Sequence, residues 1–400
     1  MSLIQSLPSE ILIQIWATVS QHKIRRLIPI TQVCARWRAV ALGASELWLD
    51  IQIFERDINH SEVVLEHFRR SQDRPIRLEL QLISRKRLAT SSRIHTFFQS
   101  VVLPNIWRCW SLTVRGTTRA WEVVLPQLAH QTFPLLRELD IADVEYWLSV
   151  SSPPNRQDLT FPLLANHPIE KLAMHAINVG QVALPCLRAL RVGDMDGVIG
   201  DDGYINEWLL EGPESLELCR WVIPAMYFQT ADDRVRGVSS VKHLKLAHLH
   251  ASTTTEGTQN DCAPFFDALE TPAIRTLELE AFHGRVLEDF MFSLQPQTVG
   301  TAKYSLVSRL TLRSLDFPKP SYRAVAFFLV SFPALESIAV IDCPQPTWEC
   351  CIQVLTLDPT RCPKVSTVEV NGVRLERNEP LPFALADLLD RPTEVDYSEL

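Results

Sequence analysis

The stretch PLLRELDI, residues 134–141, carries the pattern that decides the fold. Its apolar residues Leu136, Leu139 and Ile141 form a kernel in which the second and third residues follow the first at +3 and +5. The second and third alternate with polar residues, as in a strand that buries one face. The same spacing returns in PCLRALRV, residues 185–192, which indicates that the chain repeats one structural unit.

Copies of this kernel follow one another from residue 109 to residue 370. Several copies have proline two residues before the first apolar position, which suits a boundary from helix to strand because proline ends a helix and needs no amide donor. These prolines are Pro134, Pro185, Pro272, Pro333 and Pro363. The central residues of the kernels are Leu112, Leu139, Leu172, Leu190, Leu216, Leu244, Leu277, Leu310, Ile338 and Val368.

Segments between the kernels have helical periodicity, at residues 120–128, 204–210, 263–269, 286–294, 322–332 and 348–357. Neither a one-faced strand nor an amphipathic helix can bury its apolar side alone, whereas parallel strands stacked under an outer layer of helices bury both. The kernel resembles a leucine-rich repeat without a regular Asn or Cys ladder. We therefore expect an α/β fold for residues 51–375, a solenoid of parallel strands and helices. The alternative is an α/β domain with a parallel sheet and no solenoid.

The first fifty residues have a different pattern and predict three short helices. Pro8 suits the start of the first helix, because the fixed φ of proline and its missing N–H cost nothing there. We expect Val33, Trp37, Val40 and Ala41 to share a later helix that Gly43 ends. Between these two helices, Ile24, Leu27 and Ile28 predict a short element that ends at Pro29.

Residues 1–50 also contain Leu-Pro-x-Glu-Ile-Leu, Val-Cys-x-x-Trp-Arg and Leu-Trp, in that order, and this order resembles an F-box. The F-box is the helical module by which substrate receptors dock on the Skp-type adaptor of cullin–RING ubiquitin ligases. Trp16 stands where the family more often has Phe, and the middle segment KIRRLIPI is more basic than usual. The adaptor-binding residues that the resemblance implies are Leu7, Pro8, Ile11, Leu12, Ile15, Trp16, Val33, Cys34, Trp37, Leu47 and Trp48.

The function that this resemblance implies is substrate recognition in an SCF-type ubiquitin ligase. The helices would bind a Skp-type adaptor and through it a cullin, and the repeats would hold an unknown protein substrate. Two other classes of function are compatible with the residues. One is a non-catalytic scaffold whose N-terminal helices only cap the array. The other is a small-molecule receptor whose pocket would be lined by Arg137, Arg188, Lys242 and Arg309.

Composition restricts the partners and the compartment. The 400 residues carry a net charge of −8 and no basic stripe, so nucleic acid is not an expected partner. We expect no signal peptide, since Glu10 and Gln14 interrupt the N-terminal apolar run, and no membrane span, since the longest apolar stretch, residues 324–332, is too short. Nine cysteines without a Cys-x-x-Cys pair favour a reducing compartment, the cytoplasm or nucleus. Residues 376–400 are expected to form a cap or tail.

Catalytic motifs are absent from the sequence, so we expect no enzymatic activity and no cofactor. A metal site at His243, His248 and His250 is a weak possibility, because His248 and His250 would share one strand face without nearby carboxylates. The acidic segment 194–203 is better explained as a turn than as a calcium site. Segments 153–158 and 251–261 are expected to be loops, and Cys350 and Cys351 to lie in the core.

Overall fold

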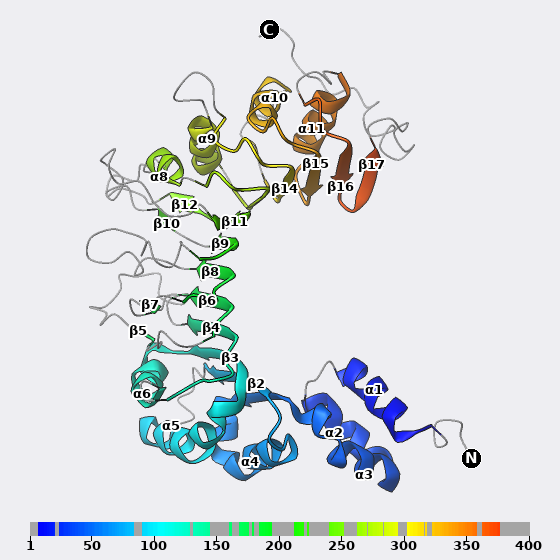
Figure 1. Cartoon of the computed structure of the whole chain (residues 1–400), viewed down its shortest axis with the longest axis vertical. Coiled ribbons are helices and arrows are strands. Elements are labelled where there is room, and N and C mark those ends of the chain that lie inside the picture. Colours follow the sequence, from blue (N-terminus) through cyan, green and yellow to red (C-terminus); the bar gives the residue numbers. More distant parts are fainter. Residues whose placement is uncertain are drawn as a thin grey trace. The chain divides into compact units, whose positions relative to one another are not determined.

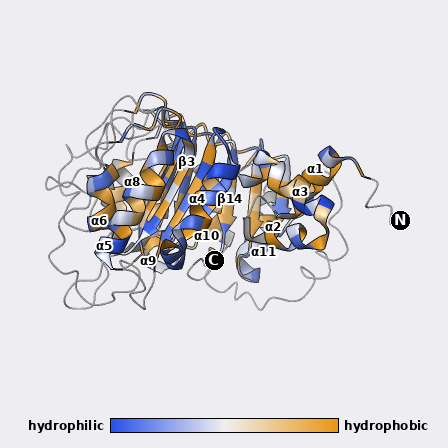
Figure 2. Cartoon of the chain, turned by 90° about the horizontal axis from the view of Figure 1, so that it is seen from below, coloured by the Kyte–Doolittle hydropathy of each residue, from blue (hydrophilic) through white to orange (hydrophobic). Residues whose placement is uncertain are grey.

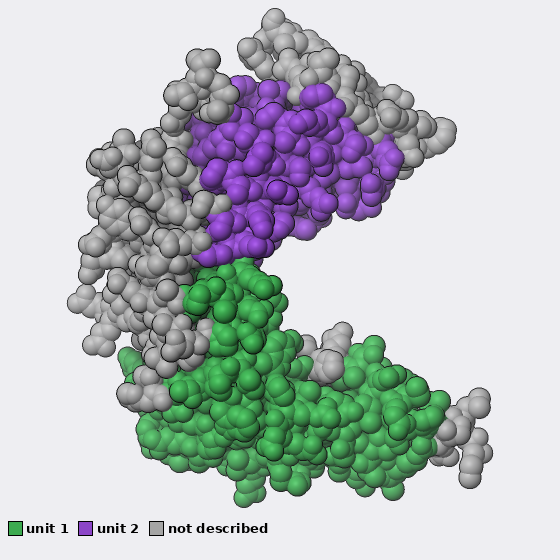
Figure 3. Space-filling model, viewed as in Figure 1, with its two compact units in different colours: residues 1–200 green, residues 201–400 purple. Residues whose placement is uncertain are grey.

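The structure is a computed structural model, and the chain forms two compact units, residues 1–200 and 201–400 (Figures 1 and 3). Each unit is an α/β structure built on a mostly parallel sheet. The structure describes residues 7–20, 24–83, 90–128, 131–144, 160–161, 168–175, 178–179, 184–193, 212–219, 222–223, 240–251, 262–269, 271–282, 284–294, 302–315, 317, 322–357 and 362–376.

The first unit begins with helices and continues as a sheet with helical connections. The N-terminal helices are α1 (Ser9–Ser20), α2 (Ile24–Val33) and α3 (Ala35–Gly43), followed by the 3₁₀ turn η2 (Ser45–Trp48). The strands are parallel in the order β1 (Asp50–Phe54), β2 (Ile76–Leu82), β3 (Cys109–Gly116), β4 (Glu138–Asp143), β6 (Lys171–His175) and β8 (Ala189–Gly193). The pair β5 (Thr160–Phe161) and β7 (Asn178–Val179) stands apart.

The helical connections of the first unit lie between its first four strands. They are η3 (Glu55–His60), α4 (Ser61–Arg70), α5 (Ser91–Phe97), the π-helical turn η4 (Phe98–Val102), the 3₁₀ helix η5 (Leu103–Arg108) and α6 (Thr118–Leu128).

The second unit repeats this arrangement. Its strands run in the order β9 (Ser215–Cys219), β11 (His243–Ala247), β13 (Thr276–Glu280), β14 (Arg309–Arg313), β15 (Ser337–Ile341), β16 (Thr367–Val370) and β17 (Val373–Glu376), and only β17 is antiparallel to its neighbour among these described strands. The helices α8 (Ala263–Ala268), α9 (Gly284–Ser293), α10 (Tyr322–Val330) and α11 (Gln345–Leu357) lie along one side of these strands (Figure 1). The short strands β10 (Val222–Ile223) and β12 (His250–Ala251) pair separately.

The kernels of the sequence lie side by side in the sheets, and this confirms the expected parallel α/β fold. In the first unit each central kernel leucine is the direct partner of the next, and the second unit repeats the alignment. All of these side chains are buried. The aligned rows are Leu112, Leu139, Leu172 and Leu190 in the first unit, and Leu216, Leu244, Leu277, Leu310, Ile338 and Val368 in the second.

Left-handed residues end four successive strands of the second unit, namely His248, Ala281, Ser314 and Asp342, with φ between 50° and 55°. The amide of His248 donates to the Glu280 carbonyl at 2.8 Å, and the turns at Ala281 and Ser314 make equivalent bonds to the next strand. Each turn directs the following side chain into the core, and these side chains are Leu249, Phe282, Leu315 and Cys343.

That inward position is the one at which a regular leucine-rich repeat has Asn or Cys. Among these four inward side chains, that of Cys343 forms a hydrogen bond to the main chain. Its Sγ accepts from the amide of Leu315 at 3.4 Å. At His248, Ala281 and Ser314 a main-chain bond to the next strand therefore takes the place of a side-chain ladder, whereas the amide of Asp342 donates to Asn371 Oδ1 at 2.8 Å.

Aromatic rings fill the core of the second unit between the helices and the sheet. Phe290 of α9 contacts Phe266 of α8 and Phe328 of α10, with ring centroids 5.1 and 6.4 Å apart. Phe332 extends the cluster to Tyr304, whose ring it stacks on at 6.3 Å. The helices of neighbouring repeats are thus joined through side chains rather than through main-chain bonds.

A buried arginine secures the end of α4 in the first unit. Arg108 is 2% exposed and donates to the Phe68 carbonyl at 2.8 Å and to Ser71 Oγ at 2.9 Å. Burial lowers the pKa of this guanidinium. A cation at a helix C-terminus meets carbonyl oxygens that have no partner within the helix, and this offsets its desolvation.

Several local expectations were wrong. Pro29 lies inside α2 and does not end it, and Val33 is the last residue of α2 rather than part of the next helix. Cys34 separates the two helices as the N-cap of α3, its Sγ accepting from the Trp37 amide at 3.4 Å. His248 and His250 do not share a strand face, because β11 ends at Ala247 and the left-handed turn intervenes.

Other differences concern elements that were missed or that fall elsewhere. Helix α5 with η4 and η5 was not predicted, nor was β17. The turn before β17 is Asn371-Gly372, with both φ values positive, as a two-residue hairpin requires. Ala251 belongs to β12 rather than to the loop expected at 251–261. Segments 153–158, 194–203, 204–210, 252–261 and 377–400 lie outside the described residues, and the division at residues 50 and 375 stays a prediction.

We predict that Leu277→Ala lowers the free energy of unfolding by about 2–5 kcal/mol, because Leu277 is fully buried in the aligned row and truncation leaves a cavity. Urea unfolding followed by tryptophan fluorescence measures the change. Thr311→Ala is the control, since Thr311 lies on the opposite face of β14 and should change stability by less than about 1 kcal/mol. Equal losses in both variants would contradict the assigned register.

A second prediction concerns the hairpin glycine. Gly372 has φ of +85°, so Gly372→Ala should cost about 1–2 kcal/mol of stability through backbone strain. Gly43→Ala is the matched control, because Gly43 is the last residue of α3 and an added Cβ meets nothing within 4 Å. The control should be neutral or stabilising by up to about 1 kcal/mol. The same unfolding assay would disprove the hairpin geometry if Gly372→Ala were also neutral.

Candidate functional site

Helix α1 has two apolar stripes, and only one of them is buried. Leu12 and Trp16 lie against the rest of the chain at 1% and 2% exposure, in line with the buried Ser20. One residue earlier in each turn, Ile11 and Ile15 are 41% and 43% exposed, and Val19 continues their line at 62%. Residues four apart lie on one helix face, so Ile11, Ile15 and Val19 form an exposed apolar stripe.

Helix α2 repeats this division beside α1, which it packs against. Leu27 is fully buried, whereas Ile28 is 49% and Val33 is 60% exposed. The helices α1 and α2 are rich in hydrophobic residues in Figure 2. Large apolar side chains clustered on two neighbouring helices are typical of a surface that binds another molecule.

The helices keep this shape through a core of three tryptophans. The rings of Trp16 and Trp37 lie 5.2 Å apart and tilted, which joins α1 to α3. Trp48 is 3% exposed, and its Nε1 donates to the Ala41 carbonyl at 2.8 Å. Each of these aromatic contacts buries a large area and, for Trp48, also satisfies its polar N–H. The exposed stripe on α1 is therefore not needed to hold the helices together.

Two arginines connect the ends of the helices. Arg36 of α3 donates to the Leu7 carbonyl, just before α1 begins. Arg38 donates through Nε to the Thr31 carbonyl of α2 at 2.9 Å. The first turn of α1 is closed by a bond from the Leu12 amide to the Pro8 carbonyl at 3.1 Å. The bonds to Leu7 and Pro8 thus secure the start of α1, and the bond from Arg38 joins α3 to α2.

Trp48 also attaches the helices to the sheet through α4. Its ring lies 5.6 Å from His67, and the Arg70 guanidinium covers it at 4.6 Å. Glu66 accepts from both Arg69 and Arg70, and these hydrogen bonds lower the pKa of its carboxyl to about 2. Burial, and then the Arg70 charge, lowers the pKa of His67. His67 therefore favours its neutral form against the Trp48 ring.

The residues implied by the F-box resemblance separate into two groups. Leu12, Trp16, Leu47 and Trp48 are buried within the chain, so they support the helices from inside. Ile11, Ile15, Val33 and Pro8 are exposed, and Leu7, Cys34 and Trp37 are half-buried. The set omitted Val19 and Ile28. Val19 could have been found by continuing the four-residue spacing from Ile11 and Ile15.

In each unit, the basic residues considered for a small-molecule pocket lie at the starts of different strands. Arg137, Arg188 and Lys242 precede different strands, Arg309 begins β14, and all four are exposed. Arg137 pairs with Glu170 at 3.3 Å and Lys242 with Glu214 at 3.0 Å. Their side chains are thus in solvent or in surface ion pairs.

The outward-facing strand residues carry paired charges in each unit. In the first unit Lys171 meets Glu138 on the next strand at 2.7 Å. In the second unit Lys245 contacts both Glu278 and Glu280, at 3.0 and 2.5 Å. The hydrogen bonds from Lys245 outweigh burial and lower the pKa of the Glu280 carboxyl. Opposite charges on neighbouring strands stabilise a flat polar surface.

The described part of the chain was expected to hold neither a metal site nor a reactive cysteine. No group of three or more His, Cys, Asp or Glu residues there is placed to hold a metal ion. Cys351 is buried, as expected, and Cys350 is half-buried. Burial raises the pKa of both thiols, which keeps them protonated.

No helix among the described residues is both long and apolar enough to cross a membrane. No protein-family model matches the sequence, and no curated protein matches it. The arrangement of residues is therefore the basis for a functional conclusion.

We predict opposite outcomes for neighbouring residues of α1. Trp16→Ala should lower the free energy of unfolding by about 3–5 kcal/mol, because it removes a buried aromatic side chain. Ile15→Ser should change it by roughly 0.5 kcal/mol or less, because that side chain is exposed. Thermal unfolding of the full chain followed by circular dichroism gives both values. A large loss for Ile15→Ser would mean that the chain itself uses the stripe.

Proposed function

We propose that the protein is the substrate-recognition subunit of an SCF-type cullin–RING ubiquitin ligase. In this proposal the F-box module is formed by α1–α3 with η2 and docks on a Skp-type adaptor, which connects it to a cullin. The repeats, as a divergent leucine-rich-repeat-like solenoid, hold a protein substrate. The protein itself performs no catalysis in this scheme, and its compartment would be the cytoplasm or nucleus.

The exposed apolar stripe Ile11, Ile15 and Val19 is the observation that carries the proposal. A helix that only capped the array would turn its apolar face toward the chain, as Leu12 and Trp16 do. The second stripe lies free beside them. A helix with i, i+4 and i+8 apolar anchors is suited to a hydrophobic groove on another protein.

Binding energy can come from the stripe without any rearrangement of the helices. Each of its half-exposed side chains can gain about 1 kcal/mol when a partner covers it. The bonds from Arg36 and Arg38 already order the helix ends, so less entropy is lost on association. Arg36 and Arg38 are themselves exposed, which favours an adaptor surface with acidic residues at its rim.

The outward faces of the sheets are suited to hold a protein substrate. Part of their charge is paired across neighbouring strands, as between Asp50 and Arg77 at 3.8 Å. Arg77 also lies 4.9 Å above the ring of Trp110. Tryptophan and arginine are the residue types most enriched in binding hot spots, so this stack is a suitable anchor for a substrate.

We predict that a Skp-type adaptor copurifies with the full chain in a stoichiometric complex. Ile11→Glu/Ile15→Glu should reduce the recovered adaptor at least about tenfold, since charges replace two anchors in an apolar groove. Size-exclusion chromatography and circular dichroism establish that the variant is folded.

Val63→Glu/Leu65→Glu is the matched control. These residues are 56% and 41% exposed on α4, and the same changes there should leave adaptor recovery unaltered. Loss of the adaptor in both variants would indicate a nonspecific charge effect. No recovery by the folded wild-type chain would refute the ligase proposal and favour the scaffold alternative.

A further inference from the structure

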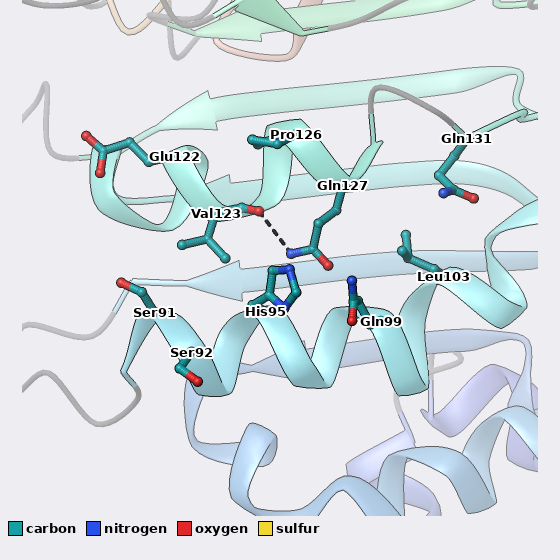
Figure 4. Close-up of a pocket in the computed structure, with 10 residues that line it drawn as sticks. All are labelled: Ser91, Ser92, His95, Gln99, Leu103, Glu122, Val123, Pro126, Gln127 and Gln131. Carbon is teal, nitrogen blue, oxygen red and sulfur yellow. Dashed lines mark hydrogen bonds between the residues drawn. The ribbon is translucent and has the colours of Figure 1, made fainter.

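A groove of about 650 Å³ runs between α5 and α6 in the first unit (Figure 4). This volume lies in the range of ligand-binding sites, but the groove is open to solvent rather than enclosed. The two helices are also joined by a hydrogen bond from Arg119 Nε of α6 to Ser91 Oγ at the start of α5, at 3.2 Å. The groove is separate from the α1–α2 residues on which the proposed function depends.

Gln127 has an unsatisfied polar atom at this groove. Its side chain is 9% exposed and points from α6 toward α5, where His95 and Gln99 face it (Figure 4). The amide Nε2 donates to the Val123 carbonyl at 2.9 Å. The amide oxygen Oε1 is hidden from solvent and accepts no hydrogen bond. A buried amide oxygen without a donor destabilises the folded chain, so its retention needs a reason.

Pro126 leaves a second acceptor of α6 without its usual donor. It lies inside α6 and has no amide N–H, so the carbonyl of Glu122, four residues earlier, lacks its usual main-chain donor. Both Glu122 and Pro126 line the groove. Two oxygens of α6, Gln127 Oε1 and the Glu122 carbonyl, therefore lack their usual donor, and a ligand with N–H groups would complement them.

The lining also indicates what kind of molecule supplies them. Gln99, Gln127 and Gln131 each carry a carboxamide, which offers one acceptor oxygen and two donor hydrogens. A peptide main chain has the complementary groups, an N–H and a C=O in every residue. An open groove between two helices can receive an extended chain, whereas a small molecule would stay largely exposed there.

We propose that the groove between α5 and α6 binds an extended segment of another protein through its main chain, with one peptide N–H donating to Gln127 Oε1. For that N–H to reach Oε1, the side chains of His95 and Gln99, which face Gln127 and are exposed on α5 (Figure 4), turn aside as the segment enters. This site is independent of the adaptor surface, and it stands even if no Skp-type adaptor binds.

The test uses the full-length protein and an immobilised array of N-acetylated, C-amidated decapeptides of random sequence. The strongest binder is resynthesised, and its Kd is measured by fluorescence anisotropy. Each main-chain amide of this peptide is then methylated in turn. We expect one N-methyl position to weaken binding to the wild type at least about tenfold, because it removes the donor to a buried oxygen.

Gln127→Met is the decisive variant, since it keeps the size and charge of the side chain but has no acceptor oxygen. In this variant the same N-methyl peptide should bind within about twofold of its unmethylated form. Gln32→Met, at an exposed position of α2, is the control and should behave as the wild type.

Two results would overturn the proposal. One is an array without any peptide whose binding depends on Gln127. The other is an N-methyl penalty that persists unchanged in Gln127→Met.

Discussion

The in-register alignment of the kernel residues is the constraint on which the rest of the structure depends. Side chains alternate along a strand, so a shift of one residue would turn Leu139 or Leu277 from the core to solvent. When neighbouring parallel strands carry the same kernel, all of their central leucines stay in the core in one common register. The helices then have one common apolar layer to cover, and the aromatic cluster around Phe290 joins them. Loops between the kernels can vary in length without disturbing the register, which explains the irregular spacing of the repeats.

The helices α1–α3 relate to this array in a different way. Trp48 anchors them to α4, while Trp16 and Trp37 hold them to each other. These contacts account for the buried side of α1 but leave Ile11, Ile15 and Val19 without a role in folding. In a stable chain an apolar stripe that folding does not use is most simply explained by a partner. The proposed adaptor surface rests on this difference between the buried stripe with Leu12 and Trp16, which supports the fold, and the exposed stripe, which does not.

Much of the fold could be predicted from the sequence, because kernel leucines such as Leu244 and Leu310 carry a periodic signal that packing directly requires. The errors arose where local and tertiary effects compete. Pro29 was expected to end a helix, yet α2 continues past it, since buried Leu27 and the bond from Arg38 to Thr31 hold the helix on both sides. The segment with His248 was read as one strand, whereas the left-handed turn is needed to bury Leu249.

The candidate site was only partly predictable, since spacing identifies a helix face but not which of two adjacent apolar stripes is covered. The most direct test of the proposed adaptor surface is carbene footprinting of the full chain with and without a Skp-type adaptor, with labelling quantified residue by residue. We expect the adaptor to reduce labelling of Ile11, Ile15 and Val19 strongly, while exposed Phe292 in the second unit is labelled as before. Unchanged labelling of α1 in the presence of bound adaptor, with protection elsewhere, would contradict it.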